Sequence, residues 1–298
     1  MSKGAFHESV PEQRRHDGHP RCGAHPFAYC HRPGNEFFFT ADCSEEEGVR
    51  ATGTSPPVVP EKPRIHTEGG MADGGSYLVA MCAGDDPEKV RDVLKAGVDP
   101  NSLNSMGRSA LNIAADHGNL EIVQLLLDDG AKVDLRSWGF STALFSATGA
   151  EHAQIMKLLI ARGADVNAQD EQQYRPLHLA ARKSRECVEI LISAGAEVNC
   201  LESHGYSPLH YAAVSGKRDI VEFLIDSGAN VNLTSDNNYT VLMATVDQDG
   251  LGKEMTLEMI NLLLSKGANP NIRNSGDMTA YDIATQRHFD DAAALLKY

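Results

Sequence analysis

The chain has 298 residues, of which 42% are hydrophobic and 6% aromatic, and its formal net charge at pH 7 is −14. This length allows one large domain or two ordinary ones. The acidic balance argues against nucleic acid and anionic membranes as general partners, because both require a surplus of Lys and Arg. No apolar run approaches the roughly 20 residues that span a bilayer, so we expect no membrane insertion.

The cysteines indicate the compartment. There are six of them, and their spacing does not match a disulfide framework. This usage is typical of a reducing environment. The N-terminus lacks the apolar segment of a secretory signal. We therefore expect the protein in the cytoplasm or the nucleus.

The first segment, residues 1–75, is rich in Pro and His and lacks apolar periodicity. Such a composition does not bury enough apolar surface to offset the entropy of ordering, so we expect a disordered leader. Its stretch "HDGHPRCGAHPFAYCH" contains four candidate zinc ligands, His19, Cys22, His25 and Cys30. A structural zinc site requires two chelating pairs separated by a longer spacer, so weak binding by a His-rich tract is the competing interpretation.

From Tyr77 onward the sequence repeats. The glycines that close the apolar runs are spaced 33, 33, 32, 33 and 39 residues apart, and they are Gly97, Gly130, Gly163, Gly195, Gly228 and Gly267. A fixed period of this length indicates a repeat architecture. The excess in the last interval falls in residues 246–256, where we expect a longer loop between two helices.

The unit "YRPLHLAARKSRECVEILISAGAEVN" (174–199) predicts two helices and a turn. Pro176 suits a first helical position because its missing N–H would be unpaired there. In the other units the preceding residue is a hydroxyl that can cap the helix: Ser109, Thr142, Ser207, Thr240 or Thr279. Here that position is Arg175, so we expect the cap to be lost. Gly195 ends the second helix in the left-handed conformation.

These units resemble the ankyrin repeat, whose signature is T-P-L-H-x-A in a 33-residue period. "RPLHLA" and "SPLHYA" match closely, and "GADVN", "GAEVN" and "GANVN" match the segment after the second helix. The resemblance implies an all-α solenoid of residues 76–298, with about five full repeats and degenerate capping units at both ends. We place the units at about 76–106, 107–139, 140–172, 173–204, 205–237, 238–276 and 277–298.

The resemblance also implies a function. Ankyrin repeats bind other proteins through a concave face built from hairpin tips and first helices. The sequence contains no nucleophile elbow, H-E-x-x-H motif or dinucleotide-binding glycine turn. We therefore expect a monomeric, non-catalytic adaptor or regulator without a cofactor. The alternative is a metal-responsive regulator whose leader binds zinc and gates the repeat surface.

Two aromatic residues are candidates for partner contact. Trp138 and Phe140 lie at a predicted hairpin tip, where polar residues are usual, and large aromatics anchor interfaces. The alternative is that Trp138 folds back as local packing. Tyr174, Tyr206 and Tyr239 share one position in successive units, and there we favour stacking between units.

A group of basic residues forms the second candidate, and we refer to it as the basic set: Arg182, Lys183, Arg185, Lys217 and Arg218. These residues lie one repeat apart at the ends of first helices in an acidic chain. A basic patch would select an acidic partner segment. The alternative is a solvated surface with internal partners such as Glu186 and Asp219.

The resemblance assigns roles to five further residues. The motif histidines, His178 and His210, would form hydrogen bonds between repeats rather than act in catalysis. The turn asparagines, Asn167, Asn199 and Asn232, occupy the position at which ankyrin repeats are substrates of an asparagine hydroxylase.

Overall fold

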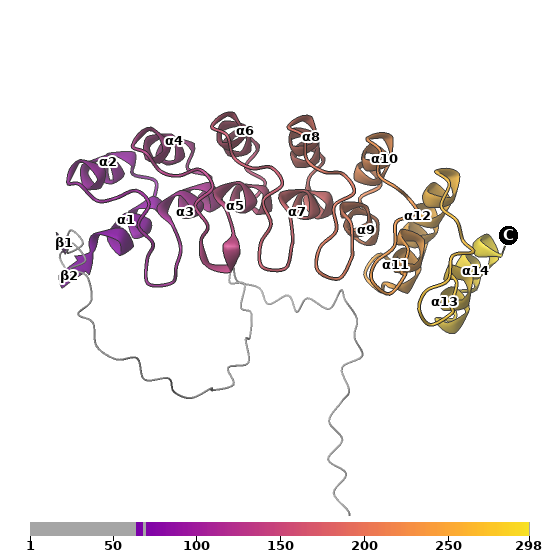
Figure 1. The fold of residues 1–298 in the computed structure, drawn as a ribbon. Helices are drawn as coiled ribbons and strands as arrows, with labels where there is room; N and C mark the ends of the chain where they lie inside the picture. Colours follow the sequence, from indigo (N-terminus) through magenta and orange to yellow (C-terminus); the bar gives the residue numbers. More distant parts are fainter. Residues whose placement is uncertain (1–63, 68–69, 298) are drawn as a thin grey trace, which may run out of the picture. The chain divides into compact units, whose positions relative to one another are not determined.

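The structure is a computed structural model that describes residues 64–67 and 70–297. All described elements belong to one unit of the chain, Pro56–Tyr298. Fourteen α-helices of this described part alternate between two layers, as Figure 1 shows. The predicted all-α repeat fold is confirmed.

The first helix of each repeat lies in an inner layer, on the side of the hairpins (Figure 1). The inner helices are α1 (Gly74–Cys82), α3 (Ala110–His117), α5 (Ala143–Gly149), α7 (Pro176–Lys183), α9 (Pro208–Val214), α11 (Val241–Asp247) and α13 (Ala280–Gln286). The outer helices are α2 (Pro87–Lys95), α4 (Leu120–Asp128), α6 (Ala153–Ala161), α8 (Arg185–Ser193), α10 (Arg218–Asp226), α12 (Lys253–Ser265) and α14 (Asp290–Leu296).

One leucine per repeat fixes the core between the two layers. It stands near the start of the inner helix and is at most 1% exposed in five consecutive repeats, at Leu111, Leu144, Leu177, Leu209 and Leu242. Small alanines on the same helices are fully buried and let neighbouring inner helices approach closely. Each repeat therefore buries its apolar face against its neighbours rather than within itself.

Four of the five predicted hydroxyl caps bond directly to a helix amide, and the hydroxyl of the fifth, Ser207, lies 2.8 Å from Nδ1 of His210. The hydroxyls of Ser109, Thr142, Thr240 and Thr279 accept hydrogen bonds from the amide three residues later, at 3.2–3.3 Å. In the unit that starts with Arg175 the hydroxyl is missing, as expected. There, Nδ1 of His178 accepts from the Arg175 amide at 3.1 Å, so the imidazole supplies a cap from inside the helix.

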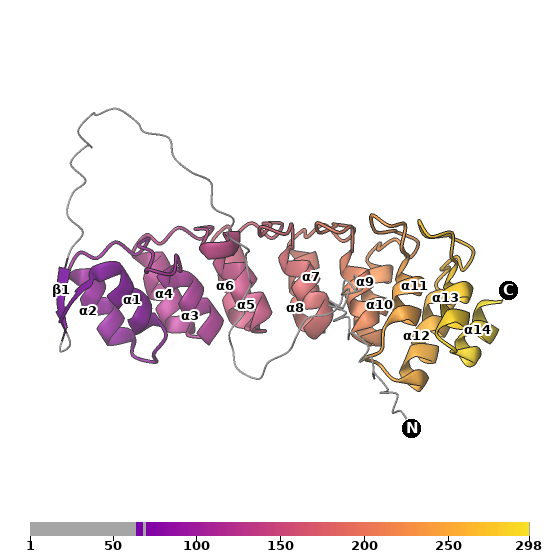
Figure 2. The same cartoon turned by 90° about the horizontal axis from the view of Figure 1, so that it is seen from below.

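Hairpins connect the repeats along one edge of the unit, and their tips are joined to one another. At five successive junctions a backbone amide of one tip donates to a carbonyl of the preceding tip at 2.8–3.3 Å. The pairs are Trp138 to Gly107, Glu171 to Gly139, Ser203 to Gln172, Asp236 to His204 and Ser275 to Asn237. Figure 2 shows these hairpins in a row along one edge, with the turns between inner and outer helices at the opposite edge.

The insertion at 246–256 is only partly the loop that we expected. Helix α12 has 13 residues, whereas each of the other outer helices has nine or fewer, so the insertion adds about a turn of helix. Asp247 and Asp249 form ion pairs with Arg287 of the next unit. Toward the preceding unit, Leu251 and Met255 lie over Gly216 so closely that a Cβ there would overlap them. The insertion therefore fastens its own unit to both neighbouring units.

The N-terminal boundary differs from the prediction. Strands β1 (Arg64–Thr67) and β2 (Gly70–Asp73) pair antiparallel, and α1 starts at Gly74. The described elements therefore begin before residue 76, where we placed the start of the repeats, and the disorder of the leader stays a prediction. The Asp73 side chain accepts from the Gly75 amide at 2.9 Å. This cap starts the helix before its first large apolar residue, from which periodicity was counted.

Candidate interaction surface

The predicted tip aromatics lie on the surface. The side chains of Trp138 and Phe140 are 65% and 51% exposed, so Trp138 is not folded back as local packing. Met106, on the tip of the preceding hairpin, is also 65% exposed. The Trp138 amide donates to the Gly107 carbonyl at 2.8 Å, which holds the two tips together. We call Met106, Trp138 and Phe140 the apolar tip patch.

Phe140 adopts an unusual backbone conformation. Its φ is +59°, in the left-handed region, and the preceding Gly139 has φ +73°. The equivalent tip position in the other repeats is held by Gly107, Gln173, Gly205, Asn238 and Asp277, and all of these except Gln173 are residue types that tolerate this conformation. A phenylalanine in the left-handed region costs about 1–2 kcal/mol. Phe140 therefore makes its turn less stable than Gly or Asn would.

Arg136 supports the patch from its own hairpin. Its guanidinium lies 5.7 Å from the centroid of the Phe140 ring and donates to the Gln169 carbonyl at 2.8 Å. Arg136 thereby links the Phe140 ring to the next hairpin. Sequence reasoning had not singled out Met106, because only the tip-to-tip hydrogen bond places it beside Trp138.

The basic set is located elsewhere. Arg182 and Lys183 end α7, whereas Arg185 and Arg218 begin the outer helices α8 and α10. All five residues lie at the turns between inner and outer helices, the edge opposite the hairpins in Figure 2. An eight-residue helix, about 12 Å long, separates the two edges. The tip aromatics and the basic set therefore lie on opposite edges of the stack.

Four of the five basic side chains have partners within the chain. Lys183 donates to the Gly149 carbonyl at the end of α5. Arg185 binds Glu189 at 2.8 Å and the Asp219 carbonyl at 2.9 Å, and Arg218 binds Glu222 at 3.2 Å. The Arg182 guanidinium lies 5.9 Å from the Tyr211 ring centroid. These contacts favour the alternative interpretation, in which the basic set has internal partners.

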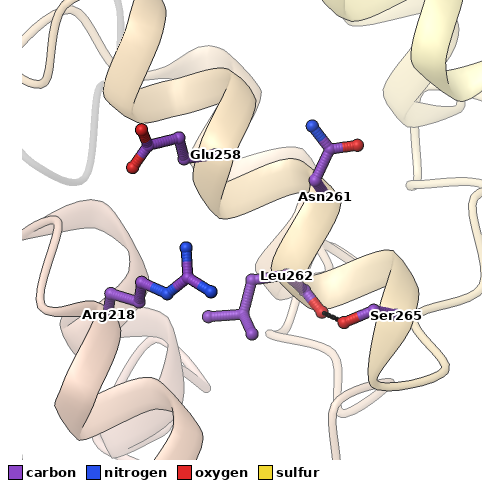
Figure 3. Close-up of a pocket in the computed structure, with 5 residues that line it drawn as sticks. All are labelled: Arg218, Glu258, Asn261, Leu262 and Ser265. Carbon is purple, nitrogen blue, oxygen red and sulfur yellow. Dashed lines mark hydrogen bonds between the residues drawn. The ribbon is translucent and has the colours of Figure 1, made fainter.

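Arg218 also lines a pocket of about 390 Å³ between α10 and α12. Figure 3 shows its guanidinium directed toward α12, which contributes Glu258, Asn261, Leu262 and Ser265. The Ser265 hydroxyl donates to the carbonyl of Leu262 at 2.6 Å, within the same helix. The lining therefore balances one cation against one anion and lies on the outer layer, away from the hairpin tips.

Comparison with known proteins settles the family. A family model described as ankyrin repeats in three copies matches residues 76–170 and 166–235, and an ankyrin-repeat model matches residues 237–275. The chain belongs to the ankyrin-repeat family. Together the matches cover most of the predicted repeat region.

Curated proteins share stretches of this ankyrin array. Serine/threonine-protein kinase 12 of Arabidopsis thaliana is 33% identical over 122 residues, which is 39% of this chain and 26% of that protein. Nuclear factor NF-kappa-B p105 subunit of Gallus gallus is 40% identical over 97 residues, 31% of this chain and 10% of that protein. Putative ankyrin repeat protein FPV014 of Fowlpox virus is 37% identical over 98 residues, 31% and 22% of the two chains. The chain thus spans about a quarter or less of these relatives.

The ankyrin-motif histidines connect repeats and are buried. Nε2 of His178 lies 3.2 Å from the Tyr206 carbonyl, and Nε2 of His210 lies 3.2 Å from the Tyr239 carbonyl. Nδ1 of each ring accepts from the amide that starts its own helix, so each ring is neutral with its proton on Nε2. Burial lowers the pKa of both imidazoles to about 4.

The predicted aromatic stacking between ankyrin units is present at one position, because only the Tyr174 ring contacts a ring of the next unit, that of Tyr211. The other ring contacts of these tyrosines lie within their own units. The Tyr174 ring lies 5.1 Å from the rings of both His178 and Tyr211, and the Tyr206 ring lies 5.3 Å from that of His210. Tyr239 is held differently, because its hydroxyl donates to Asp247 at 2.6 Å. These aromatic contacts fasten the hairpins onto the inner helices.

The turn asparagines form a ladder that joins successive ankyrin repeats. Nδ2 of each donates to the carbonyl of the glycine that ends the next outer helix, at 2.9–3.3 Å, in the pairs Asn101–Gly130, Asn167–Gly195, Asn199–Gly228 and Asn232–Gly267. Oδ1 of each accepts from the amide two residues beyond that glycine, at 2.7–2.9 Å. Hydroxylation of Asn167, Asn199 or Asn232, implied by the family, stays a prediction; in the folded ladder both amide atoms are engaged.

The ladder has a gap that a single substitution should close. Asp134 occupies the asparagine position, and its carboxylate accepts from the Asp165 amide at 3.1 Å but has no hydrogen to donate to the Gly163 carbonyl. We expect Asp134→Asn to raise the free energy of unfolding by about 1 kcal/mol, because it adds the missing hydrogen bond. Urea denaturation measures the change. Asn167→Asp is the matched reverse substitution and should lower stability; equal effects of the two would contradict the ladder.

The candidate zinc ligands His19, Cys22, His25 and Cys30 lie outside the described residues. Within the described residues, no group of three His, Cys, Asp or Glu side chains is placed to hold a metal ion. Every helix of the same part falls short of the length and apolar character that a membrane crossing requires.

Proposed function

We propose that this protein is a non-catalytic adaptor or regulator that binds a partner protein through the apolar tip patch. Ankyrin repeats are general protein-interaction modules, and that role applies to this chain. The observation that supports this particular surface is Phe140. It combines half exposure with a left-handed backbone, so it neither fills the core nor suits its turn. Strained residues of this kind cluster where a ligand is bound.

The patch has the chemistry of an interface anchor. Three large apolar side chains stand on two neighbouring tips whose backbones are hydrogen-bonded to each other. A surface ordered before binding loses little conformational entropy when a partner docks. Burial of Trp138 against a partner would contribute about 25 cal/mol for each Å² of apolar surface. Because the basic set has internal partners on the opposite edge, we leave it out of the proposed surface.

We also propose that the protein works in a reducing compartment, the cytoplasm or the nucleus. The three cysteines of the described chain, Cys82, Cys187 and Cys200, are free and buried inside the repeats. Burial raises the pKa of the Cys82 thiol to about 12 and that of Cys200 to about 11, so both are protonated and behave as small apolar residues.

The proposed function predicts that substitution of Phe140 weakens partner binding without lowering the stability of the fold. Phe140→Asn removes the aromatic ring but places in the turn a residue that tolerates φ near +60°. We expect an unchanged or slightly higher midpoint of urea denaturation and a loss of partner binding of tenfold or more. Gln173→Asn is the matched control, because Gln173 has φ +60° at the same position of the next tip. It should leave binding unchanged.

Site-specific photo-crosslinking identifies the surface directly. A benzoylphenylalanine at position 138 should give a covalent adduct with the partner in cells, and Phe140→Asn should abolish it. The same photo-crosslinker at Glu121, exposed on outer helix α4, provides the control. Adducts of equal yield at both positions, or no adduct at position 138, would exclude the tip patch as the interface.

A further inference from the structure

The charges along the hairpin tips are of one sign. Each tip consists of three residues: 105–107, 138–140, 171–173, 203–205, 236–238 and 275–277. These eighteen positions contain no Lys or Arg, and their formal charges are those of Glu171, Asp236 and Asp277. The apolar tip patch occupies the N-terminal tips, and the carboxylates occupy tips that follow it. The edge therefore changes from apolar to acidic along the stack.

Two of these carboxylates form no ion pair with a described residue. Glu171 and Asp236 are exposed and take part in no ion pair of the described residues. Asp277 pairs with Arg273 at 3.4 Å. Two arginines stand beside the patch in the sequence: Arg136 contacts the Phe140 ring and the Gln169 carbonyl, and Arg108 pairs with Asp116 at 3.5 Å. Glu171 and Asp236 are thus the charges that the tip edge presents to a partner.

We propose that the tip edge binds an extended segment of the partner that combines an apolar anchor with basic residues. This inference rests on the proposed function and specifies its ligand. The anchor packs on the apolar tip patch, and Lys or Arg side chains meet Glu171 and Asp236. The tip amides and carbonyls named above already bond to one another, so recognition is through side chains. Opposite charges across an interface fix the register of the bound segment.

The spacing of the repeats sets the spacing within the segment. Neighbouring helices pack about 8–10 Å apart, and an extended chain advances about 3.3 Å per residue, so one repeat corresponds to about three residues. Glu171 lies one repeat and Asp236 three repeats beyond Trp138. The basic residues should therefore follow the anchor by about three and about nine residues.

Two synthetic peptides test the inference with the full chain. Both carry the same Leu-Trp-Leu anchor in a Gly/Ser background; one has Lys at the two spaced positions and the other has Glu. Each is made in both sequence directions, because side-chain recognition leaves the direction open. We expect the Lys peptide to bind about tenfold more tightly in fluorescence polarisation at low salt, with the difference shrinking as salt is added.

Variants separate the inference from the proposed function. Glu171→Gln with Asp236→Asn should remove the difference between the two peptides, whereas Trp138→Ala should weaken both. Glu254→Gln with Glu258→Gln, on outer helix α12, removes the same charge and should change neither. Equal affinity of the two peptides for the unsubstituted chain, a difference that survives Glu171→Gln with Asp236→Asn, or no binding of either peptide would overturn the inference. The crosslink at position 138 decides the proposed function separately.

Discussion

Acidification from pH 7.5 to pH 5 should destabilise this protein by about 4 kcal/mol through two buried imidazoles. His178 and His210 have pKa values of about 4 in the folded chain and about 6.5 when exposed. Between these values the unfolded state binds protons that the folded state excludes. Their stabilisation is complete above pH 6.5 and is lost as the pH falls toward 4. Each ring then contributes about 2 kcal/mol of the loss at pH 5.

The chain itself supplies the control for this effect. Asn112 occupies the same helix position as the two histidines, and its Nδ2 donates to the Ser141 carbonyl of the next hairpin at 3.0 Å. His178→Asn with His210→Asn should therefore keep the contact between repeats but remove the titration. Urea denaturation of both proteins at pH 5 and pH 7.5 measures the difference. A doubly substituted protein with the original pH dependence would exclude these histidines as its source.

The second large effect concerns Gly205, and we expect Gly205→Ala to lower the free energy of unfolding by about 3 kcal/mol. Gly205 has φ +79°, and a Cβ there would lie 2.6 Å from the Asp236 amide nitrogen and 2.9 Å from the Ser235 Cα. Both obstacles are backbone atoms of the next hairpin. The substitution therefore combines left-handed strain with overpacking between two tips.

A second glycine separates the two contributions. Gly195 has a similar φ of +90°, but a Cβ there would meet no atom within 4 Å. Gly195→Ala should therefore cost only the strain, about 1 kcal/mol. Thermal and urea denaturation of both variants measure the two costs. If the variants were equally destabilised, the close approach of the tips at Gly205 would have no energetic consequence.

Regular features of the fold were predictable because they depend on neighbours in the sequence. The period of the glycines, the hydroxyl caps and the leucine at each inner helix are local or strictly repeated, so a single chain reveals them. The cap formed by His178 was missed, although its position three residues after Arg175 was visible. The imidazole satisfies the amide of the residue before the helix, a different group from the one that a hydroxyl caps, and His210 forms the same bond with the Ser207 amide.

The surface was less predictable because it depends on contacts between repeats. The exposure of Trp138 follows from the tip position, but the left-handed backbone of Phe140 becomes visible only when the tips are aligned in space. The partners of the basic set were only partly visible, because Glu189 and Glu222 stand four residues after Arg185 and Arg218, whereas the Gly149 carbonyl that binds Lys183 lies about one repeat away. A contact with a backbone carbonyl of another repeat cannot be predicted from residue types, because every residue has such a carbonyl.

The chain of hydrogen bonds between tips has a mechanical consequence. Every junction from Gly107 to Ser275 is tied backbone to backbone along the hairpin edge, whereas α10 and α12 on the outer layer border a pocket. If the stack bends, we expect the outer helices to spread or close while the hydrogen-bonded hairpin edge keeps its length. A segment bound along the tips would keep its register through such bending. The hairpin edge would thus keep the distance between Trp138 and Asp236 constant.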